Sequence, residues 1–171
     1  NGCPPNVFLR SRNMMITRKD QQFMDLSLAG SKIFSTCRRR QYMAIIVNEA
    51  NAVVSIGYNG APSSMQHCVD GGCPRAQTLK IGEGHGSPYG DCIAQHAEAG
   101  ALIRANYAEI YGSDCTMYIN GIPCYDCAKL IATSSIKRLV YLEDSDYDST
   151  KSKDILNQTG VELISLGTRQ E

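Results

Sequence analysis

Two short segments, separated by enough residues for one helix and one strand, most constrain how this chain folds. The first reads His96-Ala97-Glu98 and the second reads Pro123-Cys124-Tyr125-Asp126-Cys127. One imidazole and two thiolates suit zinc, and a catalytic zinc takes three protein ligands and leaves its fourth position to water. We therefore expect a fold that brings His96, Cys124 and Cys127 to one Zn²⁺ ion.

Glu98 has a different expected role. It lies two residues beyond His96, roughly 200° around a helix, so it does not duplicate the metal contact if both residues lie in a first turn. Its carboxylate is then available to move protons. At the second segment, a proline suited to the first turn of a helix precedes Cys124, and a helix N-terminus stabilises thiolates.

The order of these residues matches H-x-E…P-C-x-x-C, the pattern of zinc deaminases that act on nucleobases. Alone, His-x-Glu is usually a helix surface, and Cys-x-x-Cys is more often a structural zinc site or a redox pair. A redox pair would leave His96 and Glu98 unexplained. The combination predicts hydrolytic deamination, in which Glu98 carries a proton from the activated water to N3 of cytosine and a second proton to the departing amino group.

Three further segments carry a family resemblance. They are Gly57-Tyr58-Asn59-Gly60-Ala61-Pro62-Ser63, Gly71-Gly72-Cys73-Pro74-Arg75 and Cys92-Ile93-Ala94-Gln95-His96-Ala97-Glu98. From about residue 17 to about residue 166, the chain resembles the deoxycytidylate (dCMP) deaminases of the cytidine deaminase-like superfamily. The first segment separates dCMP deaminases from nucleoside and tRNA deaminases. The resemblance implies conversion of dCMP to dUMP and ammonia, which supplies thymidylate synthesis.

The resemblance also implies substrate contacts. Asn59 would hydrogen-bond the deoxyribose or the base, and Ser63 would lie beside the 5′-phosphate. Ala97 would line the substrate site, and Tyr147 would stack on the pyrimidine. An ordinary turn accounts equally well for the glycine and proline after Asn59, and an ordinary surface tyrosine accounts equally well for Tyr147.

The implied partners are small molecules and further copies of the chain. The resemblance implies a homo-oligomer, often a hexamer, activated by dCTP with Mg²⁺ and inhibited by dTTP. Arg104 would face a subunit interface, an effector phosphate or simply solvent. The chain has 17 Lys and Arg against 17 Asp and Glu, which disfavours long nucleic acid as a partner. No apolar run approaches the roughly 18 residues of a membrane span, and we expect a cytoplasmic protein.

Four cysteines outside the metal motif form a second group of candidate ligands. A closed structural Zn²⁺ site would anchor the long loop that follows Tyr58, which has few apolar residues of its own. His67 and His85 are additional donors, and buried free thiols are the alternative explanation. The proposed ligands are Cys37, Cys68, Cys73 and Cys92.

Two positions depart from the family pattern. Gly100 stands where the family usually has Asn, and Met43 stands where a strand usually has glycine. Met43 would either reshape the pocket floor or simply repack a strand. These departures leave two alternatives open: a deaminase of 5-methyl- or 5-hydroxymethyl-dCMP, and a non-catalytic zinc-binding deoxynucleotide sensor. A free cytidine or tRNA adenosine deaminase is a further alternative, and the neutral charge disfavours the tRNA enzyme.

Apolar periodicity predicts an α/β fold, a three-layer α/β/α sandwich with a five-stranded mixed sheet. We interpret residues 1–15 as an N-terminal arm or a cloning remnant and 16–171 as one zinc-dependent deaminase domain. A long loop over 59–90 is expected to be functional. The predicted helices are 17–34, a helix that contains His96 and runs to about residue 106, 124–133 and 151–157. The predicted strands are 44–47, 53–58, 116–119, 138–142 and 161–166.

Overall fold

The computed structural model describes residues 16–75, 92–105, 110, 113–145 and 147–169. The predicted fold class is confirmed, because five strands form one mixed sheet in the order β2-β1-β3-β4-β5. The strands are β1 (Met43–Val47), β2 (Val53–Tyr58), β3 (Cys115–Ile119), β4 (Ile136–Glu143) and β5 (Glu162–Thr168). The helices are α1 (Arg18–Phe34), α3 (Ala97–Arg104), α5 (Tyr125–Thr133) and α6 (Thr150–Gln158), with a short 3-10 helix, η1 (Cys68–Asp70).

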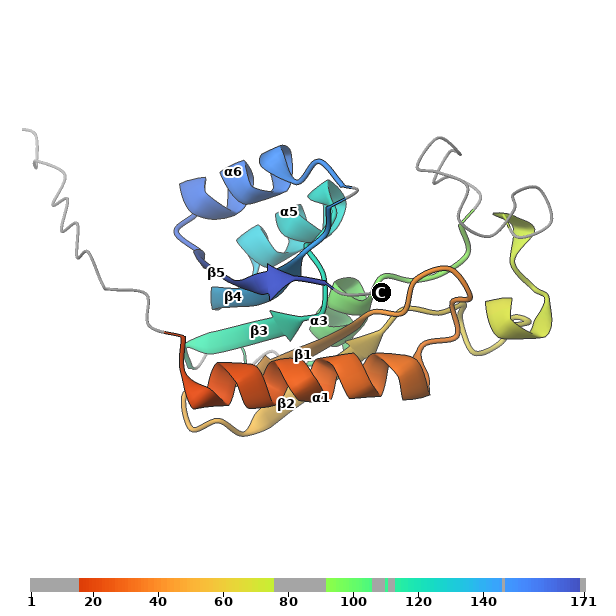
Figure 1. Ribbon diagram of the computed structural model, residues 1–171, viewed down its shortest axis with the longest axis horizontal. Coiled ribbons are helices and arrows are strands. Elements are labelled where there is room, and N and C mark those ends of the chain that lie inside the picture. The colour runs from red at the N-terminus through yellow and green to blue at the C-terminus, as the bar shows by residue number, and fades with distance from the viewer. Residues whose placement is uncertain (1–15, 76–91, 106–109, 111–112, 146, 170–171) are drawn as a thin grey trace, which may run out of the picture.

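The sheet is antiparallel on one side and parallel on the other. Strand β1 pairs antiparallel with β2 and β3, whereas β3, β4 and β5 run parallel to one another. Figure 1 shows α1 on one side of the sheet and α5 and α6 on the other. Helix α3 shares a hydrophobic cluster with α5 and α6, so three helices cover that face. The C-terminal ends of the three parallel strands meet at one edge, where α/β folds place ligands.

Strand β1 is buried along its whole length because helices cover both of its faces. Ala44 and Ile46 belong to the cluster shared with α3 and α5, whereas Met43 belongs to the cluster shared with α1. A Cβ atom on Gly30 of α1 would overlap the Met43 sulfur, so these two side chains are complementary in size. The interpretation of Met43 as part of the pocket floor is therefore wrong, because its side chain lies on the opposite face of the sheet from α3 and α5.

A buried ion pair anchors the start of α1 to the sheet. Thr17 caps the helix by accepting a hydrogen bond from the Asp20 N–H, and the Asp20 carboxylate accepts one from the Thr17 N–H, which completes a capping box. Arg138 of β4 donates to both carboxylate oxygens of Asp20, at 2.6 and 2.9 Å. Burial opposes ionisation of Asp20, but these bonds and one from Tyr118 outweigh it and hold the pKa of Asp20 below its ordinary value.

None of the helices in the described ranges combines the length and the apolar character that crossing a bilayer requires.

Candidate active site

Two helix N-termini carry the three predicted metal ligands. His96 is the N-cap of α3 and Cys124 is the N-cap of α5, both with extended backbone conformations. The expected boundaries are wrong here, because neither residue lies inside its helix and Pro123 precedes the cap instead of occupying the first turn. Helix α3 ends at Arg104. Cys124 nevertheless lies at the N-terminus of α5, where the helix dipole favours a thiolate.

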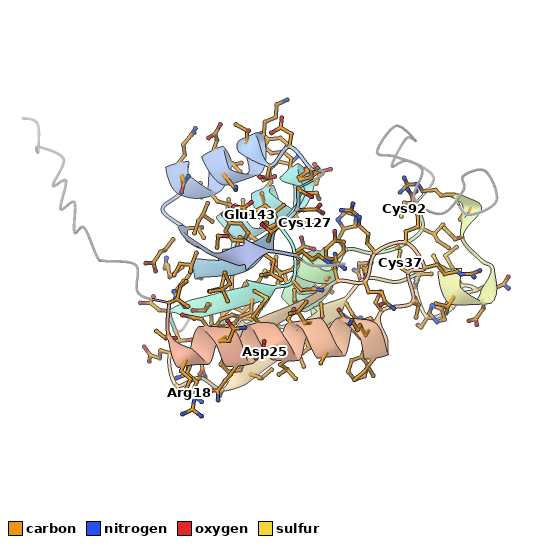
Figure 2. All side chains as sticks on the ribbon, in the orientation of Figure 1. Arg18, Asp25, Cys37, Cys92, Cys127 and Glu143 are labelled. Carbon is orange, nitrogen blue, oxygen red and sulfur yellow. The ribbon has the colours of Figure 1, made fainter. Side chains whose placement is uncertain are left out.

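The donor atoms of the three residues lie close together. Nδ1 of His96 is 3.3 Å from Sγ of Cys124 and 3.5 Å from Sγ of Cys127. In the described part of the chain, this is the only group of three or more His, Cys, Asp or Glu side chains whose donor atoms all lie within 4.8 Å of one another. Cys127 lies on α5, one turn beyond the cap (Figure 2).

The electrostatics of this cluster fit a divalent cation. A hydrogen bond from the Cys127 thiol lowers the pKa of Cys124 to about 4, and His96 contributes in the same direction. The hydrogen bond to Cys124 in turn raises the pKa of His96 to about 9. The neighbouring Cys124 thiolate and burial raise the pKa of Cys127. Without a metal the cluster therefore retains two protons at neutral pH, and a zinc ion that replaced them would satisfy all three donors.

Glu98 lies in the first turn of α3 and is only 5% exposed. Burial raises its pKa to about 7, although His96 opposes the shift. A carboxyl group with a pKa near neutrality both accepts and releases protons readily under physiological conditions, as a general acid and base requires. His96, Cys124 and Cys127 all interact with this carboxyl, so Glu98 lies beside the metal donors, and its catalytic role stays a prediction.

The turn after β2 is bonded to the segment that leads into His96. The N–H of Gly60 donates to the carbonyl of Gln95 at 3.2 Å, and the N–H of Gln95 donates back at 2.9 Å. A Cβ atom on Gly60 would overlap the Thr36 hydroxyl. Glycine is therefore needed at this position for close packing, and the paired hydrogen bonds fix the backbone immediately before the metal-binding histidine.

The Asn59 side chain has three internal partners. Its Oδ1 accepts hydrogen bonds from the Tyr42 N–H at 2.8 Å and from Ser35 Oγ at 2.5 Å, and its Nδ2 donates to the Arg40 carbonyl at 2.7 Å. Asn59 is 7% exposed. Asn59 therefore fixes the backbone of the segment that precedes β1, in addition to the substrate contact predicted for it.

The other predicted substrate-binding residues lie at different depths. Ala97 is fully buried at the start of α3, and Ser63 is exposed in the loop after β2. Tyr147 follows β4 and is partly buried against the cluster that includes α3 and α5. The family resemblance implied that all of them lie near the site, and their contacts with a nucleotide stay predictions.

The four cysteines of the predicted second zinc site converge without forming a compact donor set. Burial and the neighbouring Cys73, Cys37 and Cys92 raise the pKa of the Cys68 thiol to about 12. Figure 2 shows Cys37 and Cys92 at the same end of the molecule, beyond the C-terminal end of α1. None of the seven cysteines in the described ranges forms a disulfide. His67 instead contacts Thr36, at 3.2 Å, and His85 lies outside the described residues.

Gly100 lies where α3 packs tightly on β2. A Cβ atom on Gly57 would overlap the backbone of α3 at Ala97 and Ala101, so the helix and strand approach closely. A Cβ atom on Gly100 would lie 2.9 Å from an Arg104 nitrogen and 3.5 Å from Gln95 Oε1. Arg104 therefore occupies the space left by Gly100 and extends over the Tyr58 ring, with Cζ 5.3 Å from its centroid.

Sequence reasoning missed a cluster at the C-terminal edge of the sheet. Tyr42 donates a hydrogen bond from its hydroxyl to Asp144 at 3.2 Å, and Arg40 forms an ion pair with the same carboxylate. The Arg169 guanidinium stacks on the Tyr42 ring, with Cζ 4.5 Å from the centroid. No motif contains these residues, so the sequence carried no signal that could have identified the cluster.

Comparisons with known proteins agree with this geometry. Residues 17–143 match the family described as the cytidine and deoxycytidylate deaminase zinc-binding region. A deoxycytidylate deaminase from Saccharomyces cerevisiae is 31% identical over 89% of this chain and 46% of its own length. One from Mycobacterium phage D29 is 34% identical over 74% of this chain and 95% of its own length. This chain thus spans about half the length of the yeast relative and nearly all of the phage relative.

A solved structure also resembles this chain. The dCMP deaminase from the cyanophage S-TIM5, crystallised with dCMP and dUMP, superposes with a TM-score of 0.65 at 25% identity. The superposition covers 89% of this chain and 99% of the cyanophage chain. The likeness therefore covers most of this chain and nearly all of the cyanophage chain.

Proposed function

This chain belongs to the cytidine and deoxycytidylate deaminase family, and on that basis we propose that it converts dCMP to dUMP and ammonia by hydrolysis, supplying dUMP for thymidylate synthesis. The observation that carries the proposal is the His96, Cys124 and Cys127 cluster with the buried carboxyl of Glu98 beside it. The choice of dCMP is supported by the yeast and phage relatives and by the cyanophage enzyme, which was crystallised with dCMP and dUMP.

His96, Cys124 and Cys127 would hold the zinc, which when bound supplies Lewis-acid activation of the attacking water. Glu98 performs the proton transfers. As the water oxygen forms a bond to C4 of cytosine, Glu98 accepts a proton from that oxygen and gives it to N3. It then takes the remaining hydroxyl proton and gives it to the amino nitrogen, so the bond between C4 and nitrogen breaks and ammonia leaves.

Four residues would position the nucleotide in this proposal. The role proposed for Tyr147 is supported by its partly buried position after β4. The role proposed for Ala97 is supported by its position between His96 and Glu98. The role proposed for Asn59 is supported by its hydrogen bonds. Its Nδ2 donates one hydrogen to the segment before β1, and its second amide hydrogen has no acceptor among the described residues, so it is available to a substrate. Ser63 is supported by its exposure in the loop after β2.

The alternatives receive less support from the described residues. The hypothesis that the pocket is reshaped for a 5-modified cytosine depended partly on Met43. The Met43 side chain packs against α1 instead. A non-catalytic sensor has no need for a buried carboxyl beside the metal ligands, yet Glu98 is present and its pKa is raised to about 7. Deamination of unmodified dCMP remains the better explanation.

We further propose a structural Zn²⁺ held by Cys37, Cys68, Cys73 and Cys92. The support is that the Cys68 thiol is buried close to the three other cysteines and that a metal would relieve the unfavourable burial of several thiols in a loop region. Elemental analysis tests this: wild-type protein should contain two zinc ions per chain and Cys68→Ser one. A single zinc in both proteins would overturn it.

The remaining proposals concern assembly and regulation. We propose one deaminase domain over 16–171, in a homo-oligomer regulated by dCTP with Mg²⁺ and by dTTP. The arm expected over 1–15 lies outside the described residues. Exposed apolar side chains on α1 and α3, Ile33 at 73% and Ile103 at 72%, support an oligomer. The seven described cysteines form no disulfide, which supports a reducing, cytoplasmic setting. Light scattering and rates measured with each effector test these points.

A substrate panel tests the proposed function. Ammonia release by zinc-loaded protein is measured with dCMP, 5-methyl-dCMP, 5-hydroxymethyl-dCMP, dCTP and deoxycytidine. The highest kcat/KM is expected for dCMP. A higher kcat/KM for a 5-modified nucleotide would show that this nucleotide, and not dCMP, is the preferred substrate. Absence of ammonia with every compound would favour the hypothesis of a non-catalytic sensor.

A further inference from the structure

Asn120 lies at the point where β3 stops pairing with β1. The last pair of that ladder is Ala44 with Ile119, so Met43 and Asn120 come next. At this point the Asn120 side chain makes the hydrogen bonds. Its Oδ1 accepts from the Met43 N–H at 2.9 Å, and its Nδ2 donates to the Gln41 carbonyl at 3.0 Å. A side-chain amide offers the same donor and acceptor types as a peptide group, so Asn120 continues the ladder beyond β3.

Asn59 continues the sheet in the same way on the other side of β1. It follows β2, and its side chain bonds to the Tyr42 N–H and to the Arg40 carbonyl. Residues 40–43, here named the β1 extension, therefore have an asparagine amide on each side. Successive residues of an extended chain bond to opposite neighbours, so Asn59 holds the even-numbered residues and Asn120 holds the odd-numbered ones.

The backbones that leave the sheet at these two asparagines lead to the metal donors. After Asn59, Gly60 pairs through two backbone hydrogen bonds with the residue that precedes His96. After Asn120, the chain reaches Cys124 in four residues, or at most about 14 Å. The β1 extension is therefore a common support for the segment that carries the histidine and the segment that carries the thiols.

The segment between Asn120 and Cys124 is tightly packed. Asn120 is 1% exposed, and residues 121–123 are also buried. A Cβ atom on Gly121 would overlap the Tyr42 ring, so this ring of the β1 extension packs directly on the segment. The proline before Cys124 has a fixed φ angle. Because a close-packed interior transmits strain, a displacement of Asn120 should also displace Cys124.

The Asn120 amide uses all of its hydrogen-bonding groups. Besides its bonds to the β1 extension, Nδ2 donates to Ser31 Oγ at 3.1 Å, and Oδ1 accepts a longer bond from Ser27 Oγ at 3.5 Å. Both serines lie on α1. One side chain thus connects α1, the β1 extension and the end of β3. An aliphatic side chain in its place would leave several buried polar groups unpaired.

We propose that Asn120 is a positioning residue for deamination: by holding the β1 extension against the segment that ends at Cys124, it sets the position of the metal-binding thiols relative to the nucleotide. This inference rests on the proposed function. The β1 extension also bonds to Asn59, so the metal ligands and the predicted nucleotide contact share one support. Asn120 acts through these residues and should influence the metal site and the chemical step more than nucleotide binding.

Kinetics of Asn120→Ala with dCMP test this role. We expect kcat to fall ~10- to 100-fold, because small displacements of reacting groups slow the chemical step by such factors. KM should stay within about threefold, because Asn59 keeps its own hydrogen bonds. Asn120→Ser keeps a hydroxyl that can accept from the Met43 N–H, and its kcat should lie between those of Asn120→Ala and wild-type protein.

Asp20→Asn is the control for a general loss of stability. It breaks a buried ion pair with Arg138, which lies near the start of β4 and thus at the opposite edge of the sheet from the metal donors. Its kcat for dCMP should therefore stay within about twofold of the wild-type value. A loss of kcat in Asn120→Ala but not in Asp20→Asn is the expected result.

Zinc affinity gives a measurement that does not depend on turnover. Competition with a chelating dye is measured in a Cys68→Ser background, which is expected to leave only the site of His96 and Cys124. Asn120→Ala should bind zinc ~10- to 100-fold more weakly, as when the residues that orient metal ligands are lost. Asp20→Asn should bind zinc as tightly as the background protein.

Two results would overturn the inference. Asn120 would serve only the stability of the fold if Asn120→Ala and Asp20→Asn lowered kcat and zinc affinity equally, or if Asn120→Ala changed neither quantity. If Asn120→Ala does not fold, Asn120→Ser takes its place in the same comparison. If wild-type protein forms no dUMP, the zinc affinities still decide the role of Asn120, and the failure belongs to the proposed function.

Discussion

Nδ1 of His96 lies 3.3 Å from Sγ of Cys124, and each of the two residues is the N-cap of a different helix. The site is therefore built where two helix N-termini converge, and both helix dipoles favour negative charge at that point. This arrangement explains how a thiolate forms readily beside a histidine and why Glu98, in the first turn of α3, is buried beside the same donors.

Replacing Glu98 with Gln should separate metal binding from chemistry. The amide has nearly the same shape but transfers no proton, so kcat should fall by a factor on the order of 10³. Zinc content should equal that of wild-type protein, because Glu98 is not expected to be a ligand. Elemental analysis and ammonia release check both points, and a zinc-loaded variant that kept its turnover would contradict the assigned role.

Zinc binding should release protons. At neutral pH the pKa of His96, about 9, and the raised pKa of Cys127 keep both groups protonated, whereas the pKa of Cys124, about 4, leaves it a thiolate. Filling this site should therefore release about two protons per zinc. An indicator dye in weakly buffered, metal-free protein measures them. Comparison with Cys124→Ser, which lacks a ligand, isolates this site, and release of no protons in wild-type protein would refute the protonation scheme.

The Asp20 and Arg138 ion pair should make stability depend on acidic pH. The pKa of Asp20 is lower in the folded state than in the unfolded state, so its contribution is complete above the unfolded pKa and is lost as pH falls below it. Asp20→Asn should reduce the free energy of unfolding by ~3–5 kcal/mol at neutral pH, since it leaves a partly buried arginine without its partner.

Urea unfolding at neutral and acidic pH measures the effect of Asp20→Asn. Asp25→Asn is the control, because Asp25 lies exposed on the same helix (Figure 2) and should change stability by only about 0.5 kcal/mol. Equal effects of the two substitutions would show that the ion pair does not anchor α1.

Met43→Ala should alter stability without altering specificity. The substitution removes a fully buried side chain between α1 and the sheet and should destabilise the protein by ~2–5 kcal/mol. Because Met43 lies on the face opposite α3 and α5, the ratio of kcat/KM for dCMP to that for 5-methyl-dCMP should not change. A shift in that ratio would restore Met43 as a determinant of base specificity.

Much of the fold was predictable because local chemistry specified it. The apolar, β-branched run over 53–58 gave β2 with its observed bounds, and the apolar stripe over 17–34 gave α1 to within one residue. The convergence of His96, Cys124 and Cys127 also followed from the residues, since a shared metal requires it.

Other features depended on tertiary packing. The face on which Met43 lies was not predictable, because a strand buried on both sides has no alternation of apolar and polar residues. The cap positions of His96 and Cys124 depend on where each helix packs. The contact between Tyr42 and Arg169 joins opposite ends of the described chain and belongs to no motif.

The most direct test of the central claim is to supply zinc-loaded protein with dCMP in water enriched in oxygen-18 and to analyse the products. We predict one ammonia for each dUMP formed and one heavy oxygen at C4 of the pyrimidine, because the water oxygen replaces the amino group. Failure to form dUMP, or dUMP without the heavy oxygen, would contradict hydrolytic deamination at this site.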